Sequence, residues 1–131
     1  MEAIMLANMD AAATVGVRDM AAAREFYGNV LGLKPVDSDG GDDDMALYRS
    51  GDTRVFVYRS EYAGTNQATA ITWDVGDKFD DIVAALQSKG ARFEHYDMGG
   101  LRREGDVHIA GQLKIVWLKD PDGNILNINS A

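Results

Sequence analysis

The chain has 131 residues, of which 46% are hydrophobic, and no cysteine, so one domain with a buried core is expected and thiolate metal sites are excluded. Its net charge of −8 repels a phosphate backbone and attracts cations, which makes nucleic acid an unfavourable partner. The sequence has no apolar run of about 18 residues and no basic, signal-like start, so no membrane partner is expected. The cytoplasm, a reducing compartment, is the expected location.

The first half of the chain predicts one strand, a helix and three further strands. The helix is expected at residues 20–31, where apolar side chains recur at the spacing of one helical face. Asp19 is expected to cap its first turn through a side-chain oxygen, and Gly32 to end it in the left-handed conformation. The strands are expected at residues 12–17, 34–37, 45–49 and 54–59.

The second half repeats this order. A helix is expected at residues 78–89, with Asp77 as its cap and Gly90 at its end, at the same spacing as Asp19 and Gly32. The strands are expected at residues 68–75, 91–95, 113–119 and 125–129. The repeat predicts a single domain over residues 1–131, made of one module at about 11–61 and a second at about 67–131, with the linker at residues 64–66.

Two connections are longer than such a repeat needs. Residues 37–44, with the sequence DSDGGDDD, predict a solvated hairpin end. A cation-binding loop is the less supported alternative, because the glycine and glutamate positions of an EF-hand loop are missing. Residues 96–112 predict either a plain surface loop or a loop that covers a binding site.

Three segments carry a family pattern: VRDM and AREFYGNVLGL within residues 17–33, VGD and DIVAALQSKGARF within residues 75–93, and KDPDGNILNI at residues 119–128. Together they resemble the vicinal oxygen chelate superfamily, which includes glyoxalases, bleomycin resistance proteins and extradiol dioxygenases. The resemblance implies an α+β fold of paired βαβββ modules that form a half-open barrel. Helices would cover its outside, and a concave ligand cup would lie inside. The resemblance also implies a homodimer.

Strand alternation predicts which side chains face this cup. Apolar residues alternate with Thr14, Thr72, Asp74 and Asn127, which therefore point away from the helices. Aromatic rings on or near the same strands would add stacking surface for a planar or cationic ligand, although alternation does not decide the face of Trp117. The expected ligand-binding residues are Thr14, Tyr48, Phe56, Tyr58, Thr72, Asp74, Trp117 and Asn127.

The metal ligands that the resemblance implies are missing from this sequence. By motif position they correspond to Ala12, Ala70, Asn127 and one residue among 56–58. A methyl group cannot coordinate a metal, and a neutral amide is a poor sole ligand for a divalent ion. No metal and no other cofactor is therefore expected, and a divalent metal is the alternative.

Three side chains are candidates for catalysis. Asp74 could bind a ligand cation or act as a base, or it could lie in water at a strand edge. His95 and His108 are the only histidines, and each has acidic neighbours in the sequence. With a carboxylate they could hold iron, provided that residues 96–112 bring His108 back onto His95. A structural or exposed role for both is the simpler expectation.

Three functions remain open at this point. The favoured hypothesis is a metal-free homodimer that binds a small organic molecule in its cup, as the bleomycin resistance type does, and the acidic charge favours a cationic ligand. The alternative is a metal-dependent lyase, isomerase or dioxygenase of the same superfamily with a displaced metal site. A regulatory or structural dimer without a ligand is the third.

Overall fold

The first sheet is built by the N-terminal half, within a computed structural model that describes residues 6–36, 43–97 and 99–131. Its order is β1-β4-β3-β2, with β1 parallel to β4 and the other neighbours antiparallel. The expected strands are confirmed, although β2 is shorter than predicted. The hypotheses for residues 37–44 concern mainly residues outside the described ranges. The strands are β1 (Ala12–Val17), β2 (Lys34–Pro35), β3 (Met45–Ser50) and β4 (Thr53–Arg59).

A short 3-10 turn, η1 (Leu6–Asn8), precedes β1, and one continuous helix follows β1. It begins as α1 (Met20–Arg24) and continues as the π-helical segment η2 (Glu25–Val30). The Asp19 side chain accepts a hydrogen bond from the backbone N–H of Ala22 at 3.1 Å, which confirms the predicted cap. Gly32 has a φ of 72°, as expected for a glycine that ends a helix.

The second sheet is built by the C-terminal half and has the order β5-β10-β9-β8-β7. The strands β8 and β6 pair with the same edge of β9: β8 pairs with the beginning of β9 and β6 with its end. The strands are β5 (Thr69–Asp74), β6 (Arg92–Glu94), β7 (Arg102–Glu104), β8 (Val107–Ala110), β9 (Leu113–Lys119) and β10 (Ile125–Asn129).

The second helix, α2 (Phe79–Ser88), lies between β5 and β6 and follows a 3-10 turn, η3 (Gly76–Lys78). The prediction that Asp77 caps it was wrong. Asp77 lies inside η3, and the N-cap position is held by Lys78, which makes no side-chain capping bond. Gly90 has a φ of 77° after the helix, as predicted. Among the described helices, none has the length and apolar character needed to cross a membrane.

A hairpin, β7–β8, occupies much of the segment that was predicted as a loop at residues 96–112. Glu104 pairs with Val107, so Gly105 and Asp106 form a two-residue connection, and Gly105 has a φ of 60°. Such short hairpins favour glycine at a position with positive φ. The hairpin extends the second sheet beyond β9.

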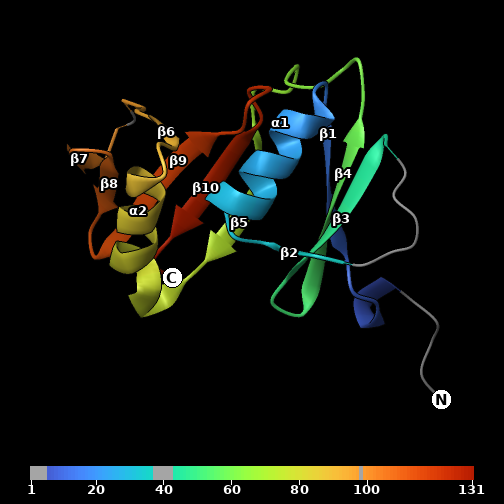
Figure 1. Cartoon of the computed structure of the whole chain (residues 1–131). Coiled ribbons are helices and arrows are strands. Elements are labelled where there is room, and N and C mark those ends of the chain that lie inside the picture. Colours follow the sequence, from blue (N-terminus) through green and yellow to red (C-terminus); the bar gives the residue numbers. More distant parts are fainter. Residues whose placement is uncertain (1–5, 37–42, 98) are drawn as a thin grey trace.

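The two helices lie on the same side of the two sheets, which do not close into a barrel, and the predicted α+β fold class is confirmed (Figure 1). We call this side of the sheets the helix face and the opposite side the open face. One hydrophobic cluster joins both helices to the helix face of both sheets. Its fully buried strand residues include Val17, Val57, Val116, Leu118 and Leu126.

The turn between β9 and β10 connects the two halves of the chain. Asp120 is 0% exposed, and its carboxylate accepts hydrogen bonds from the Tyr27 hydroxyl, the Asn124 side-chain amide and the backbone N–H groups of Asp122 and Asn124. Asn124 also donates to the carbonyl of Gly16 in β1 at 2.8 Å. Burial, together with the Asp120 carboxylate, raises the pKa of Tyr27 far above its usual value. Tyr27 therefore stays a hydrogen-bond donor to Asp120.

Candidate functional site

A pocket of about 740 Å³ lies on the open face of the second sheet, where β6 and β9 end and β5 and β10 begin. We call it the Trp117 pocket. The segment before β5 and the turn before β10 form part of its rim. Its lining residues are Gly64, Asn66, Gln67, Ala68, Thr69, Glu94, Tyr96, Asp97, Trp117, Lys119, Gly123 and Ile125.

Two aromatic rings form one wall of the Trp117 pocket. Trp117 pairs with Asn127 of β10, and paired residues of neighbouring strands share a sheet face, so Trp117 lies on the open face. Tyr96 stands edge to face against it, with ring centroids 5.2 Å apart and planes at 81°. Burial and the nearby Glu94 carboxylate raise the pKa of Tyr96. The wall is therefore neutral and aromatic near pH 7.

The charged side chains of the pocket are mostly acidic. The Lys119 ammonium lies 3.3 Å from the Glu94 carboxylate, and this ion pair lies on the same face as Trp117. Asp97 is exposed and also lines the pocket. With two carboxylates and one ammonium, the lining carries a net negative charge, which favours a cation.

The rim of the pocket depends on a close backbone contact. Gly64 has a φ of 71°, and a Cβ at this position would lie 2.0 Å from the carbonyl oxygen of Asp122. Only glycine permits this approach without displacement of the backbone. Gly64 therefore lies directly against the turn before β10.

The ligand-binding residues predicted from the sequence are spread over the open face. Trp117 alone of them lines the Trp117 pocket. Thr72 and Asp74 line a second cavity of about 500 Å³ between β5 and the first sheet. Asn127 of β10 pairs with Trp117 of β9, and its side-chain oxygen accepts a hydrogen bond from the side-chain amide of Asn129 at 3.1 Å.

Three more of the predicted residues lie on the open face of the first sheet. Thr14 pairs with Phe56, and the rings of Phe56 and Tyr58 lie 6.2 Å apart. Tyr58 is partly exposed, and none of the three lines the Trp117 pocket.

Tyr48 lies on the helix face, unlike the expectation. It is 3% exposed, pairs with the buried Val55, and packs 6.4 Å from the ring of Tyr27. On β3 it is Leu47 that pairs with Phe56 and shares its face, and the next residue, Tyr48, points to the opposite face. The ring of Tyr48 therefore belongs to the core and not to a ligand site.

The positions of the missing metal ligands do not form a metal site. Ala12 and Ala70 offer methyl groups only, and the side-chain oxygen of Asn127 already accepts a hydrogen bond from Asn129. Within residues 6–36, 43–97 and 99–131, no group of three His, Cys, Asp or Glu side chains could hold a metal ion. The donor set at these positions thus does not fit the divalent metal that the family resemblance implies.

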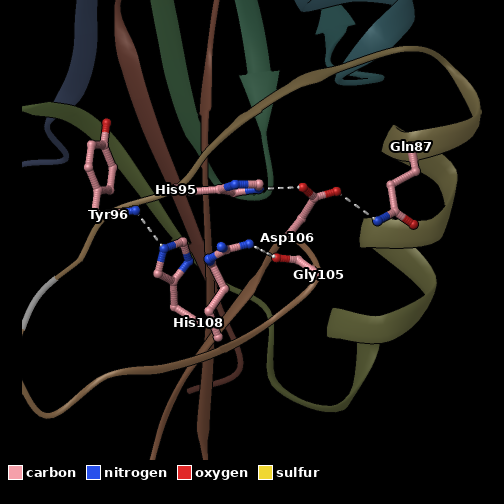
Figure 2. A network of polar contacts seen from close by, with 7 residues as sticks. Gln87, His95, Tyr96, Gly105, Asp106 and His108 are labelled. Carbon is pink, nitrogen blue, oxygen red and sulfur yellow. Dashed lines mark hydrogen bonds and ion pairs between the residues drawn. The ribbon is translucent and has the colours of Figure 1, made fainter.

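The hairpin brings the two histidines close together, with ring centroids 6.4 Å apart, but gives them different partners (Figure 2). His95 lies 2.8 Å from Asp106, whose second carboxylate oxygen accepts a hydrogen bond from Gln87 of α2 at 3.1 Å. His108 accepts a hydrogen bond from the backbone N–H of Tyr96 at 2.9 Å. The chain of contacts from His95 to Gln87 ties the hairpin to α2.

The hydrogen bond from His95 holds the pKa of Asp106 below its usual value. A carboxylate with a depressed folded-state pKa stabilises the protein above the unfolded pKa, and this contribution is lost as the pH falls. Asp106→Asn is therefore expected to lower the free energy of unfolding at pH 7 by up to ~1 kcal/mol, since the pair is partly exposed. In urea denaturation, the difference from the wild type should shrink as the pH falls below the ordinary aspartate pKa of about 4. The exposed Asp10→Asn is the control, and an Asp106→Asn effect that does not decrease with falling pH would contradict this account.

Several site residues were not among those predicted from the sequence. Glu94, Lys119 and Asp97 enter the pocket because β6 pairs with the end of β9, a contact between distant segments. Tyr96 is one of several aromatic residues on or near the predicted strands, and strand alternation did not assign it to the site. A local signal did exist for the hairpin, because Gly105-Asp106 between short alternating segments is typical of a two-residue turn.

Comparisons with known proteins agree with this fold. The family model of the Glyoxalase/Bleomycin resistance protein/Dioxygenase superfamily matches residues 10–128. No curated protein sequence matches the chain.

Solved structures of this superfamily resemble the chain at low sequence identity. A glyoxalase/bleomycin resistance protein/dioxygenase from Alicyclobacillus acidocaldarius is 20% identical, with a TM-score of 0.69 over 93% of this chain and 90% of that one. The fosfomycin resistance protein FosX from Mesorhizobium loti is 14% identical, with a TM-score of 0.68 over 97% and 94%. Lactoylglutathione lyase from Agrobacterium tumefaciens is 16% identical, with a TM-score of 0.66 over 93% and 92%. At these identities the similarity shows the fold alone.

Proposed function

Because the chain belongs to the Glyoxalase/Bleomycin resistance protein/Dioxygenase superfamily, we propose that it binds a small organic molecule, and that it does so in the Trp117 pocket without a metal ion. The observation that carries the proposal is that one pocket combines an aromatic wall with a net negative charge. The wall is formed by Trp117 and Tyr96, and the carboxylates are those of Glu94 and Asp97. A planar cation is the ligand class that fits this chemistry best.

The dimensions of the pocket support a ligand of drug-like size. Its volume of about 740 Å³ falls within the range of small-molecule sites, which is roughly 300–1,000 Å³. An aromatic face attracts a cation by about 0.5–2 kcal/mol, more strongly when water is excluded. Asp97 and the Glu94–Lys119 pair would then orient the charged part of the ligand.

We also propose that the protein is a single domain of two modules, at residues 11–61 and 67–131, and that it forms a homodimer in the cytoplasm. Members of the superfamily are commonly dimers that bind small molecules. Met45 and Tyr58, which pair across β3 and β4 on the open face, are 42% and 37% exposed. A second chain would cover these exposed side chains, and their exposure therefore supports the proposed dimer.

The alternative enzyme, with a metal displaced to the two histidines, has less support. His95 already pairs with Asp106, and the Nε2 atom of His108 already accepts the N–H of Tyr96. A metal bound at Nε2 would displace that backbone bond, and a metal bound at Nδ1 would leave the proton on Nε2, which could then no longer accept the Tyr96 N–H. Asp74, the other catalytic candidate, is exposed and lines the smaller cavity between the sheets.

A calorimetric titration with N-methylquinolinium tests the proposed ligand class. Trp117→Ala should weaken binding roughly 100-fold, about 2–3 kcal/mol, because the variant removes the stacking surface. Trp73→Phe is the matched control, since Trp73 lies on the helix side, with its indole N–H 2.8 Å from Ser50, and should bind as the wild type does. Quinoline, which lacks the charge, should bind about tenfold more weakly than N-methylquinolinium.

Two results would contradict the proposal. One is equal affinity of the wild type and Trp117→Ala for N-methylquinolinium. The other is one equivalent of a divalent metal per chain in elemental analysis of the purified protein, together with loss of binding after its removal by a chelator.

A further inference from the structure

His108 is completely buried, yet one of its ring nitrogens has no hydrogen-bond partner among the described residues. The side chain is 0% exposed, and the orphan atom is Nδ1. The other nitrogen, Nε2, accepts the backbone N–H of Tyr96 at 2.9 Å (Figure 2). Because an accepting nitrogen carries no proton, the neutral ring must carry its proton on Nδ1. The observed contact thus requires one particular tautomer of neutral His108.

The ring of His108 also supports the aromatic wall of the Trp117 pocket. His108 pairs with Ile115 of β9, so it lies on the open face, the face of Trp117. Its centroid lies 4.8 Å from the Trp117 ring at 85° and 6.3 Å from the Tyr96 ring. His108 therefore contacts Trp117 with its ring and Tyr96 through the backbone.

We infer that His108 is the positioning residue for the Tyr96–Trp117 wall, and that only its neutral form holds the pocket in its binding conformation. The inference rests on the proposed function for the identity of the ligand. His108 does not line the pocket, so it acts through the two aromatic residues. The hairpin β7–β8, which carries His108, thereby becomes part of the binding apparatus.

Charged groups from several elements surround His108. From β7, the guanidinium-bearing Arg103 is its direct pairing partner. From the chain after β6, His95 lies beside it and is engaged by Asp106. The other charged groups nearby are the Glu94–Lys119 pair beside Trp117 and the exposed Asp97 after Tyr96.

A proton on Nε2 would remove the acceptor of the Tyr96 N–H and bury a cation next to Arg103. An unpaired buried charge is strongly disfavoured, so the protonated ring would have to leave its place. Tyr96 and Trp117 would then lose their support. Acidification that protonates the ring should therefore lower ligand affinity.

The test compares N-methylquinolinium binding at pH 8 and pH 5 in the wild type, His108→Gln and His108→Leu. The wild type should bind about tenfold more weakly at pH 5. Glutamine offers an oxygen near the position of Nε2 and does not titrate, so His108→Gln should bind equally at both pH values. Leucine offers no acceptor, so His108→Leu should bind about tenfold more weakly at both. All three proteins share Glu94 and Asp97, so any titration of these carboxylates cancels in the comparison.

A second measurement needs no ligand and separates this inference from the proposed function. In Trp73→Phe, the emission of Trp117 should change between pH 8 and pH 5, because the ring beside it becomes charged and moves. The change should disappear in Trp73→Phe/His108→Gln and persist in Trp73→Phe/His95→Gln. A pH-independent Trp117 emission, or a response that persists without His108, would overturn the inference. Failure of N-methylquinolinium to bind the wild type at pH 8, with the emission change intact, would overturn only the proposed ligand.

Discussion

Asp120→Ala is expected to cause a large loss of stability, of at least ~3 kcal/mol in the free energy of unfolding. The substitution leaves buried donors without an acceptor, because Tyr27, the Asn124 amide and two backbone N–H groups all point at this carboxylate. Each unsatisfied buried donor costs about 1–3 kcal/mol, and partial entry of water reduces the sum. Equilibrium denaturation in urea at pH 7 measures the loss.

Two variants of neighbouring residues serve as controls for Asp120→Ala. Tyr27→Phe keeps the ring and removes one of the donors, so it should cost only ~1–1.5 kcal/mol. Asp122→Ala removes the other carboxylate of the turn, which accepts the backbone N–H of Arg18 at an exposed position, and should cost ~1 kcal/mol or less. If Asp120→Ala were no more destabilising than Asp122→Ala, the turn would not be the connection between the two halves that its contacts indicate.

Gly64→Ala is expected to destabilise the protein by ~2–4 kcal/mol and to weaken ligand binding at the same time. An alanine would place Cβ 2.0 Å from the carbonyl oxygen of Asp122, a distance at which the backbone must move. The positive φ of 71° adds strain of about 1–2 kcal/mol. Because Gly64 and Gly123 both line the Trp117 pocket, separation of these segments changes its rim.

The control for Gly64→Ala isolates backbone strain from the collision. Gly51 has a φ of 57°, and nothing lies within 4 Å of a Cβ built on it, so Gly51→Ala should cost only the strain of about 1–2 kcal/mol. Urea denaturation and N-methylquinolinium titration measure both variants. Equal stability losses for the two, with unchanged ligand affinity in Gly64→Ala, would show that the close approach has no role.

Local rules were sufficient for most elements of the fold. The bounds of β1, β9 and β10 agree with the predicted strands, because their apolar residues alternate over a full strand. The Asp19 cap formed, since it needs only the residues of one turn. The cap at Asp77 failed because Gly76, with a φ of 59°, begins a 3-10 turn that includes Asp77 and moves the helix start. The hairpin at Gly105 was missed although its turn signal was present.

The candidate site was predicted less completely, for a physical reason that particular residues illustrate. Alternation within one strand divides its residues between two faces but does not say which face lies against the helices. The face of Trp117 was therefore decided only by its pairing with Asn127. Tyr48 was assigned to the ligand site because it is aromatic, while the pairing with Val55 places it in the core. Glu94 and Lys119 meet only through the pairing of β6 with β9.

The sequence by itself determined the superfamily, the α+β class and the residue types, among them Ala12 and Ala70, at the positions of the implied metal ligands, because each depends on residue types and local spacing. Only the tertiary structure decided that the aromatic wall and the Glu94–Lys119 pair belong to one pocket, and that the His108 ring contacts this wall from outside the pocket. It also decided that the two histidines have separate roles, one tied to Asp106 and the other to Tyr96. These outcomes depend on contacts between segments far apart in the chain. The spacing of residues near one another in the sequence does not predict which distant segments come into contact.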